Sequence, residues 1–254
     1  MKPRDIKSFW DNRFVEFENL SSGYTNEIIQ RFDNRIRWKS FIREIPLNKS
    51  DKILDVGCNH GVWSIKLAKL GMDVTGIDLI SKAIDVAKKN AAKESLNISF
   101  KVMKAENINF NTNSFDKIIS ITVMQHILND DLFEKTLNKF NTQLKHNGLL
   151  ILMESAPNKP KPENLHFKRE RTLKYHINLC REAGFELVKA RGVSHLSVRW
   201  YYGIEDLIKH KKVKQIIQYF GLIVLNPIDI LLSRISIFNK YSVLKLMVFK
   251  KNGI

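Results

Sequence analysis

The sequence predicts an α/β protein with a doubly wound, mostly parallel sheet and helices on both faces. Short apolar, β-branched runs alternate with helix-like stretches between residues 52 and 153, and this alternation is typical of right-handed βαβ units. A glycine-containing turn follows the first apolar run, and Asp78 ends the second. With 254 residues, 44% of them hydrophobic, the chain is long enough to bury a core of this kind.

The elements of this sheet are expected in regular order. Strands are predicted at 53–56, 74–77, 98–102, 115–121 and 149–153, with helices at 62–70, 82–92 and about 130–144. A polar loop or lid at 155–170, a helix at 172–183 and a sixth strand at 185–188 come next. Residues 204–219 are predicted to be helical, Pro227 to interrupt the segment after them, and 241–249 to form a last, antiparallel strand.

Three parts of the chain are distinguished by pattern. Aromatic and aliphatic residues at helical spacing predict an N-terminal helical cap over 1–48. Residues 49–193 together with 241–254 are expected to form the sheet domain, and 194–240 a basic and apolar helical insertion.

The composition is that of a soluble, reduced protein. Cys58 and Cys180 are the only cysteines, too few for a disulfide framework or a four-ligand zinc site, and the scattered histidines do not predict a metal site. The N-terminus lacks the apolar stretch of a signal peptide, and no run of 18 apolar residues predicts a membrane span. The expected location is therefore the cytoplasm.

Charge is distributed unevenly along the chain. The net charge is +16, and residues 156–254 contribute +12 of it, with 19 basic and 7 acidic side chains. Such an excess predicts an anionic partner, either a lipid surface or a nucleic acid, unless it is simply a solvated basic surface. The basic segment 209–214 precedes the apolar run 216–225. That pairing predicts either docking at an anionic membrane interface or packing inside the domain.

The strongest local signal is the segment Asp55-Val56-Gly57-Cys58-Asn59-His60-Gly61 between the first strand and its helix. Ligands of doubly wound sheets bind beyond the carboxyl ends of the strands, and glycines allow the backbone to approach them closely. Nicotinamide binders use Gly-x-Gly-x-x-Gly, which this segment lacks. Asp55 would repel a pyrophosphate, whereas it favours a ligand carrying positive charge. A tight turn without a ligand is the alternative.

This segment resembles the first motif of the class I S-adenosylmethionine-dependent methyltransferases, with Asn59 in place of a usual glycine. The resemblance implies a Rossmann-like sheet domain that binds S-adenosylmethionine, with the Gly57–Gly61 turn around the methionine part and Asp78 on the ribose. Lys101–Glu106 resembles the strand-three motif, and Lys104 stands where an aspartate usually binds adenine, which leaves Glu106 for that role. The implied cofactor-binding residues are Asp55, Gly57, Cys58, Asn59, Gly61, Asp78, Leu79, Ala105, Glu106 and Ile121.

His126, just past the fourth strand, is the candidate catalytic residue. A base is needed only where the attacking atom carries a proton that must leave, and an imidazole is suited to that work. A structural role for His126 is the alternative. No Asn-Pro-Pro-Tyr follows the fourth strand and no cysteine lies on strands four or five, which disfavours methylation of base amines and of cytosine C5.

The favoured acceptor is an oxygen or nitrogen of a small molecule or of a glycan, including a lipid-linked glycan. Methylation of RNA or protein is the second hypothesis, because of the basic C-terminal third. A non-catalytic nucleoside-binding domain is the third, since Asn59 and Lys104 depart from the usual pattern.

Overall fold

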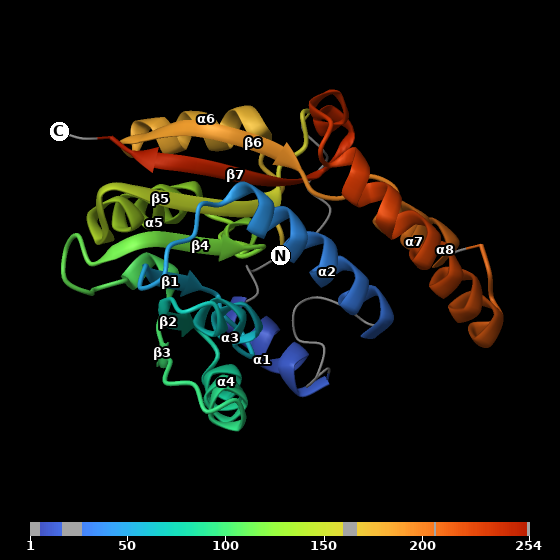
Figure 1. Cartoon of the computed structure of the whole chain (residues 1–254), viewed down its shortest axis with the longest axis horizontal. Coiled ribbons are helices and arrows are strands. Elements are labelled where there is room, and N and C mark those ends of the chain that lie inside the picture. Colours follow the sequence, from blue (N-terminus) through green and yellow to red (C-terminus); the bar gives the residue numbers. More distant parts are fainter. Residues whose placement is uncertain (1–5, 17–26, 160–166, 206, 253–254) are drawn as a thin grey trace.

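The computed structural model describes residues 6–16, 27–159, 167–205 and 207–252 (Figure 1). Its centre is a seven-stranded sheet in the order β3-β2-β1-β4-β5-β7-β6. The strands are β1 (Lys52–Val56), β2 (Asp73–Asp78), β3 (Ser99–Val102), β4 (Phe115–Ile121), β5 (Leu144–Ser155), β6 (Phe185–Gly192) and β7 (Leu244–Lys251). Strands β1 to β5 are parallel, whereas β7 is antiparallel to both β5 and β6. The predicted fold class, including the antiparallel last strand, is confirmed.

Helices cover both faces of this sheet. They are α1 (Ile6–Glu16), α2 (Glu27–Glu44), α3 (Val62–Lys69), α4 (Ser81–Lys93), α5 (Asp130–Gln143), α6 (Leu173–Glu182), α7 (Ser197–Glu205) and α8 (Lys211–Leu232). Short 3-10 turns η1 (Ala105–Asn107), η2 (Met124–His126) and η3 (Ser236–Tyr241) join some of them. The chain thus alternates strand and helix as far as β5, as the apolar pattern predicts.

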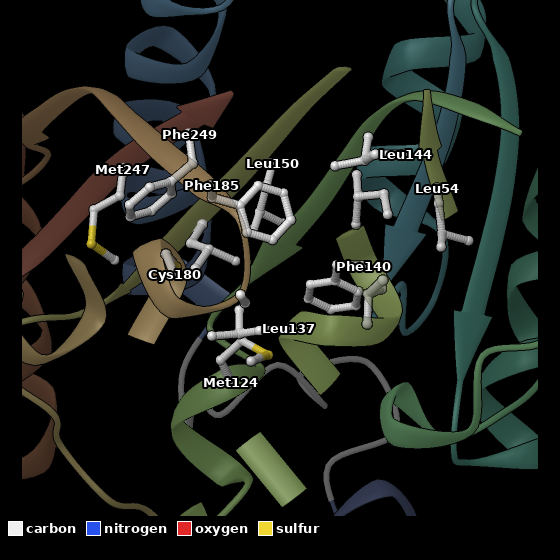
Figure 2. Close-up of a cluster of buried hydrophobic side chains, with 14 of the residues drawn as sticks. Leu54, Met124, Leu137, Phe140, Leu144, Leu150, Cys180, Phe185, Met247 and Phe249 are labelled. Carbon is white, nitrogen blue, oxygen red and sulfur yellow. The ribbon is translucent and has the colours of Figure 1, made fainter. Parts of the chain in front are cut away.

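Two core clusters lie on opposite faces of the sheet because successive residues of a strand point to opposite sides. The cluster under α5 and α6 includes Leu54, Leu137, Phe140, Leu150, Cys180, Phe185 and Phe249 (Figure 2). The cluster under α2 and α3 includes Ile36, Phe41, Ile53, Leu67, Ile119, Ile151 and Val248. This packing fixes the carboxyl ends of β1, β2 and β4 as one rigid edge.

The segment after β6 departs from the expected pattern. Residues 204–219 do not form one helix: α7 ends at Glu205, and α8 begins at Lys211. Helix α8 then continues through Pro227 to Leu232. Proline removes one N–H from the helix, but Pro227 lies on an exposed side of α8, where water can solvate the carbonyl left without a partner.

Helix α8 also corrects the expectation that no helix is long enough to span a membrane. Within the described ranges one helix, Lys212–Leu232, is long and apolar enough to cross a membrane, judged by its length and composition alone. Polar residues break the apolar run in the sequence, so the pattern alone predicts that the run ends near Asn226. Helices α7 and α8 pack on each other and project away from the sheet, with α2 beside them (Figure 1).

Candidate active site

The turn after β1 is held in an unusual backbone conformation. Gly57, Asn59 and Gly61 all have positive φ, at 73°, 50° and 77°. Asparagine tolerates this region better than most residues, which explains how Asn59 can replace a glycine. A Cβ atom on Gly57 would lie 2.2 Å from a methyl group of Val123 in the loop after β4. Glycine is therefore required where these two loops meet.

Asp78 ends β2 and connects this turn to the next strand end. Its Oδ2 accepts a hydrogen bond from the backbone N–H of Asn59 at 3.0 Å, and its Oδ1 accepts one from the N–H of Ile80 at 2.9 Å. Burial raises the pKa of Asp78, and these two hydrogen bonds oppose the rise.

Asp55 lies on β1 behind the same turn. Its Oδ2 accepts a hydrogen bond from the hydroxyl of Ser64 on α3, at 2.6 Å. Burial, together with the nearby charge of Asp78, raises the pKa of Asp55 to about 7. In the part of the chain that the structure describes, no lysine or arginine offsets either charge. A ligand with positive charge would relieve this repulsion, so the site fits a cationic cofactor.

The other residues expected to bind the cofactor lie along the same edge of the sheet. Ala105 and Glu106 form the turn η1 directly after β3, and Ile121 ends β4. Leu79 packs beside Phe14 of α1. The structure therefore brings the predicted residues to the carboxyl ends of four adjacent strands, with α1 beside them.

Cys58 contributes to this edge through its backbone. Its thiol is buried against Phe100 and Ile84, and burial raises the pKa of the thiol well above its usual value. The backbone N–H of Cys58 donates to the carbonyl of Ile77 at 2.9 Å. The side chain is thus part of the core.

His126 lies in η2, directly after β4. Its Nδ1 is 2.7 Å from the carbonyl oxygen of Phe167, so Nδ1 carries the proton and donates it. Its Nε2 lies 3.3 Å from the side-chain amide nitrogen of Gln125, which can donate to it. Burial lowers the pKa of His126 to about 4, with the charges of Lys168 and Arg13 adding to the effect. The imidazole is therefore neutral near pH 7, with Nε2 as an acceptor.

Aromatic rings enclose this imidazole. Trp10 of α1 meets it edge-on, with 4.7 Å between ring centroids, and Phe167 lies nearly parallel to it at 6.2 Å. Phe9 stacks on Phe167 at 4.6 Å. His126 does not cap α5, because Asn129 accepts a hydrogen bond from the N–H of Leu132 there.

Glu154 holds the loop that carries His126. It is fully buried at the end of β5, and its carboxylate accepts hydrogen bonds from the backbone N–H groups of Val123, Met124 and Gln125 at 2.9, 3.0 and 3.3 Å. Burial raises its pKa to about 7, against the effect of these hydrogen bonds. Glu154 thus caps the backbone of this loop.

The segment before α6 closes over the same loop. Arg171 is buried and donates to the carboxylate of Asp130 at 2.8 Å and to the carbonyl of Ile127 at 2.9 Å. Its guanidinium also lies over the ring of Phe133 at 4.2 Å. The described part of the predicted lid, from Phe167 onward, is thus fixed to the His126 loop.

One polar residue at this edge is not predicted by any motif. Arg37 of α2 forms an ion pair with Asp33 at 2.7 Å, and its Nη1 lies 3.5 Å from the hydroxyl of Thr122 in the loop after β4. The only signal in the sequence is an aspartate four residues earlier on the same helix face.

Part of the chain is similar to a known protein family. Residues 53–148 match the family model described as a methyltransferase domain. The ubiquinone biosynthesis O-methyltransferase of Pelagibacter ubique is 34% identical over 126 residues, which cover 46% of this chain and 51% of that protein. The chain thus matches about half the length of such curated relatives.

Solved structures share the fold at lower identity. The 1,6-didemethyltoxoflavin-N1-methyltransferase of Burkholderia thailandensis superimposes with a TM-score of 0.66 at 16% identity, over all of this chain and 92% of that one. The [4+2]-cyclase SpnF superimposes with a TM-score of 0.67 at 15% identity, over 98% and 96%. Residues 53–148 thus match a methyltransferase domain, and the chain shares its fold with solved methyltransferase structures. Ubiquinone biosynthesis O-methyltransferases are among the curated proteins to which it is similar.

Proposed function

We propose that this chain transfers a methyl group from S-adenosylmethionine to a hydroxyl oxygen of a small, largely apolar acceptor. The observation that carries the proposal is the position of His126, a neutral imidazole in an aromatic enclosure. Its loop meets the cofactor turn at Gly57 and Val123. The O-methyltransferase relatives support oxygen as the methylated atom.

Four residues are proposed to hold the cofactor. Gly57 and Gly61 allow the backbone to lie close to the methionine part, and the carboxylate of Asp78 accepts hydrogen bonds from the ribose hydroxyls. Asp55 places a negative charge behind them, toward the positive end of the ligand. When bound, S-adenosylmethionine supplies a methyl group on a sulfonium centre, which is already a good leaving group.

His126 is proposed to take the proton of the acceptor hydroxyl through Nε2. The carbonyl of Phe167 keeps the proton on Nδ1, so that Nε2 is an acceptor, and the substrate hydroxyl would take the place of the Gln125 amide that lies 3.3 Å from it. A pKa of about 4 makes this imidazole a weak base. An acidic hydroxyl, such as that of a phenol, needs less help from the base, so such an acceptor suits the site. Glu154 positions the loop through backbone N–H groups.

The aromatic walls also bear on the class of acceptor. Trp10 and Phe167 make the surroundings of His126 apolar, and such surroundings favour a ring over an ionic group. A ring carried on a lipid tail and a glycan hydroxyl on a lipid carrier both fit this description. Either acceptor would bring the protein to a membrane surface.

Two experiments test the proposal. In titration calorimetry, S-adenosylmethionine and S-adenosylhomocysteine should bind and NAD should not, and Asp78→Ala should weaken binding because a charged acceptor worth roughly 1.5–3 kcal/mol is lost. With methyl-labelled S-adenosylmethionine and cell-extract fractions, label should enter an extractable small molecule or lipid. His126→Ala should abolish that transfer, and the exposed His146→Ala should not. If NAD binds and S-adenosylmethionine does not, the proposal is wrong.

RNA methylation remains the second candidate, favoured by the +12 charge of residues 156–254. Label that enters nuclease-sensitive material, and not the lipid or small-molecule fractions, would move it to first place.

A further inference from the structure

Helix α8 is amphipathic, but its polar side faces the protein and its apolar side faces outward. The side that packs against the protein carries polar residues: Gln218, Asn226, Asp229 and Ser233 are all buried. Each has a partner on α2 or at α7. Gln218 donates to the carbonyl of Tyr201, and Asn226 donates to the carbonyl of Phe32. The buried face of α8 is therefore held by hydrogen bonds, with Leu222 as its buried apolar residue.

Asp229 is the main anchor of this face. Its carboxylate accepts hydrogen bonds from the backbone N–H groups of His195, Leu196 and Ser197, at 3.0, 2.7 and 2.9 Å, and from the hydroxyl of Ser197. These N–H groups lie at the start of α7, where a carboxylate is stabilising. Farther along, a Cβ atom on Gly221 would collide with Trp200 of α7. The two helices are closely fitted to each other.

The outward side of α8 is apolar. Side chains at helical spacing are exposed along its length, with exposed fractions of 56% for Ile216, 62% for Phe220, 61% for Val224 and 58% for Leu231. Val213, Tyr219, Ile223 and Ile228 are exposed beside them. An apolar stripe of this extent on a water-facing helix marks an interaction surface.

Positive charge surrounds this stripe. Lys209 and Lys212 are exposed at its beginning, and Arg234 and Lys240 are exposed just beyond its end. Residues 207–254 contain nine lysines and arginines and one acidic residue, Asp229, which is buried. An apolar face with a basic border complements an anionic lipid surface, whereas a second copy of the chain would oppose like charges.

We infer that the apolar face of α8 docks on an anionic membrane, with the helix lying in the interface. Its buried polar face keeps α8 attached to α2 and α7, which opposes a crossing of the bilayer. The inference rests on the proposed function for its purpose, because an apolar or lipid-linked acceptor would be met at that surface. Binding to lipid itself does not depend on methyl transfer.

Vesicle co-sedimentation of the whole chain tests the inference. Vesicles of phosphatidylcholine with phosphatidylglycerol should retain the protein at low salt, and phosphatidylcholine alone should not. Replacing Lys209 and Lys212 by Glu should weaken binding about 25-fold or more, because each lysine near such a surface contributes roughly 1 kcal/mol. The same reversal at the exposed Lys88 and Lys89 of α4 should have little effect.

The apolar face is tested with a matched pair. Phe220→Ser should weaken vesicle binding about tenfold, since one aromatic side chain no longer enters the interface. Val188→Ser, which changes an exposed apolar residue on β6, should leave it unchanged. The inference is wrong if each control variant loses as much vesicle binding as its matched test variant. It is also wrong if neutral vesicles bind the protein as well as anionic ones do.

A local probe distinguishes lipid from other occupants of the face. Cys58 and Cys180 are both buried, so an environment-sensitive thiol dye should label Val224→Cys selectively. Its emission should shift to the blue with anionic vesicles, and that of labelled Val188→Cys should not. A shift with RNA instead, or a shift that depends on protein concentration without lipid, would replace the membrane by RNA or by a second copy. S-adenosylmethionine binding, measured without vesicles, reports separately on the proposed function.

Discussion

Asp55→Asn should make the ligand-free protein more stable at alkaline pH while it weakens cofactor binding. Asp55 is buried, and its hydrogen-bond partner is the hydroxyl of Ser64. Asparagine keeps an oxygen that can accept this hydrogen bond but removes the charge that burial and Asp78 disfavour. Asp55 thus lowers the stability of the ligand-free protein and at the same time favours a cationic ligand, which is a trade-off typical of functional sites.

The magnitude is set by the two pKa values. Asp55 has a pKa of about 7 in the folded chain and an ordinary value of 3.8. At about 1.4 kcal/mol for each pH unit between them, the folded state loses about 4 kcal/mol relative to the unfolded state, as an upper bound. Because the pKa of Asp55 is higher in the folded state, Asp55 does not reduce the free energy of unfolding below about pH 4. Its destabilising effect develops as the pH rises to about 7. Asp55→Asn should therefore gain about 2–4 kcal/mol at pH 8 and little at pH 4.

Urea unfolding at pH 4 and pH 8, followed by circular dichroism, measures this difference. The exposed Asp73→Asn on β2 is the control and should show no such pH-dependent gain. Calorimetry at pH 8 should give a dissociation constant for S-adenosylmethionine at least about tenfold higher in Asp55→Asn. Equal destabilisation at both pH values, or unchanged affinity, would refute the role given to Asp55.

Three further predictions concern the geometry of the site. Gly57→Ala should lower the free energy of unfolding by several kcal/mol and abolish cofactor binding, since its Cβ would lie 2.2 Å from a methyl group of Val123. At Gly71 a Cβ meets nothing closer than 3.5 Å, so Gly71→Ala should cost about 1 kcal/mol of backbone strain. Similar losses of stability for the two variants in urea unfolding would contradict this. Burial lowers the pKa of His126 to about 4, so turnover should stay level from pH 8 to about pH 5 and fall only below that. If turnover instead falls near pH 6.5, and His126→Ala removes that fall, the imidazole is solvated and this prediction is wrong. Arg171→Leu should cost about 2–3 kcal/mol, because it leaves the carbonyl of Ile127 without its donor and leaves Asp130 with Arg169 as its remaining ion-pair partner. Lys145→Leu, which breaks a more exposed ion pair with Asp116, should cost less than about 1 kcal/mol. Equal effects of the two changes on the urea midpoint would disprove a fixed lid.

The core of the fold and the cofactor edge are predictable because their signals are local. Apolar runs of strand length, the turn at Gly57 and the acid at Asp78 all lie close together in the sequence. Parallel strands then bring their ends to one edge. The helix predicted at 82–92 begins one residue earlier, at Ser81, and Ile80 precedes it without a side-chain hydrogen bond to its first turn.

The features that could not be predicted depend on contacts between distant segments. The low pKa of His126 comes from enclosure that includes Trp10 and Phe167, which lie far from it in the sequence. The buried polar face of α8 is likewise set by partners on α2 and α7, whereas the local pattern only makes Asn226 the end of an apolar run. Contacts between distant segments, which no local pattern reveals, decide both.

Transfer of labelled methyl groups from S-adenosylmethionine into fractionated cell extract tests the central claim most directly. The purified chain should move the label into an apolar small molecule or a lipid, as an O-methyl ether by mass spectrometry. His126→Ala, with cofactor affinity retained, should not. Label found only in RNA or protein, or no transfer by a chain that binds S-adenosylmethionine, would contradict the account.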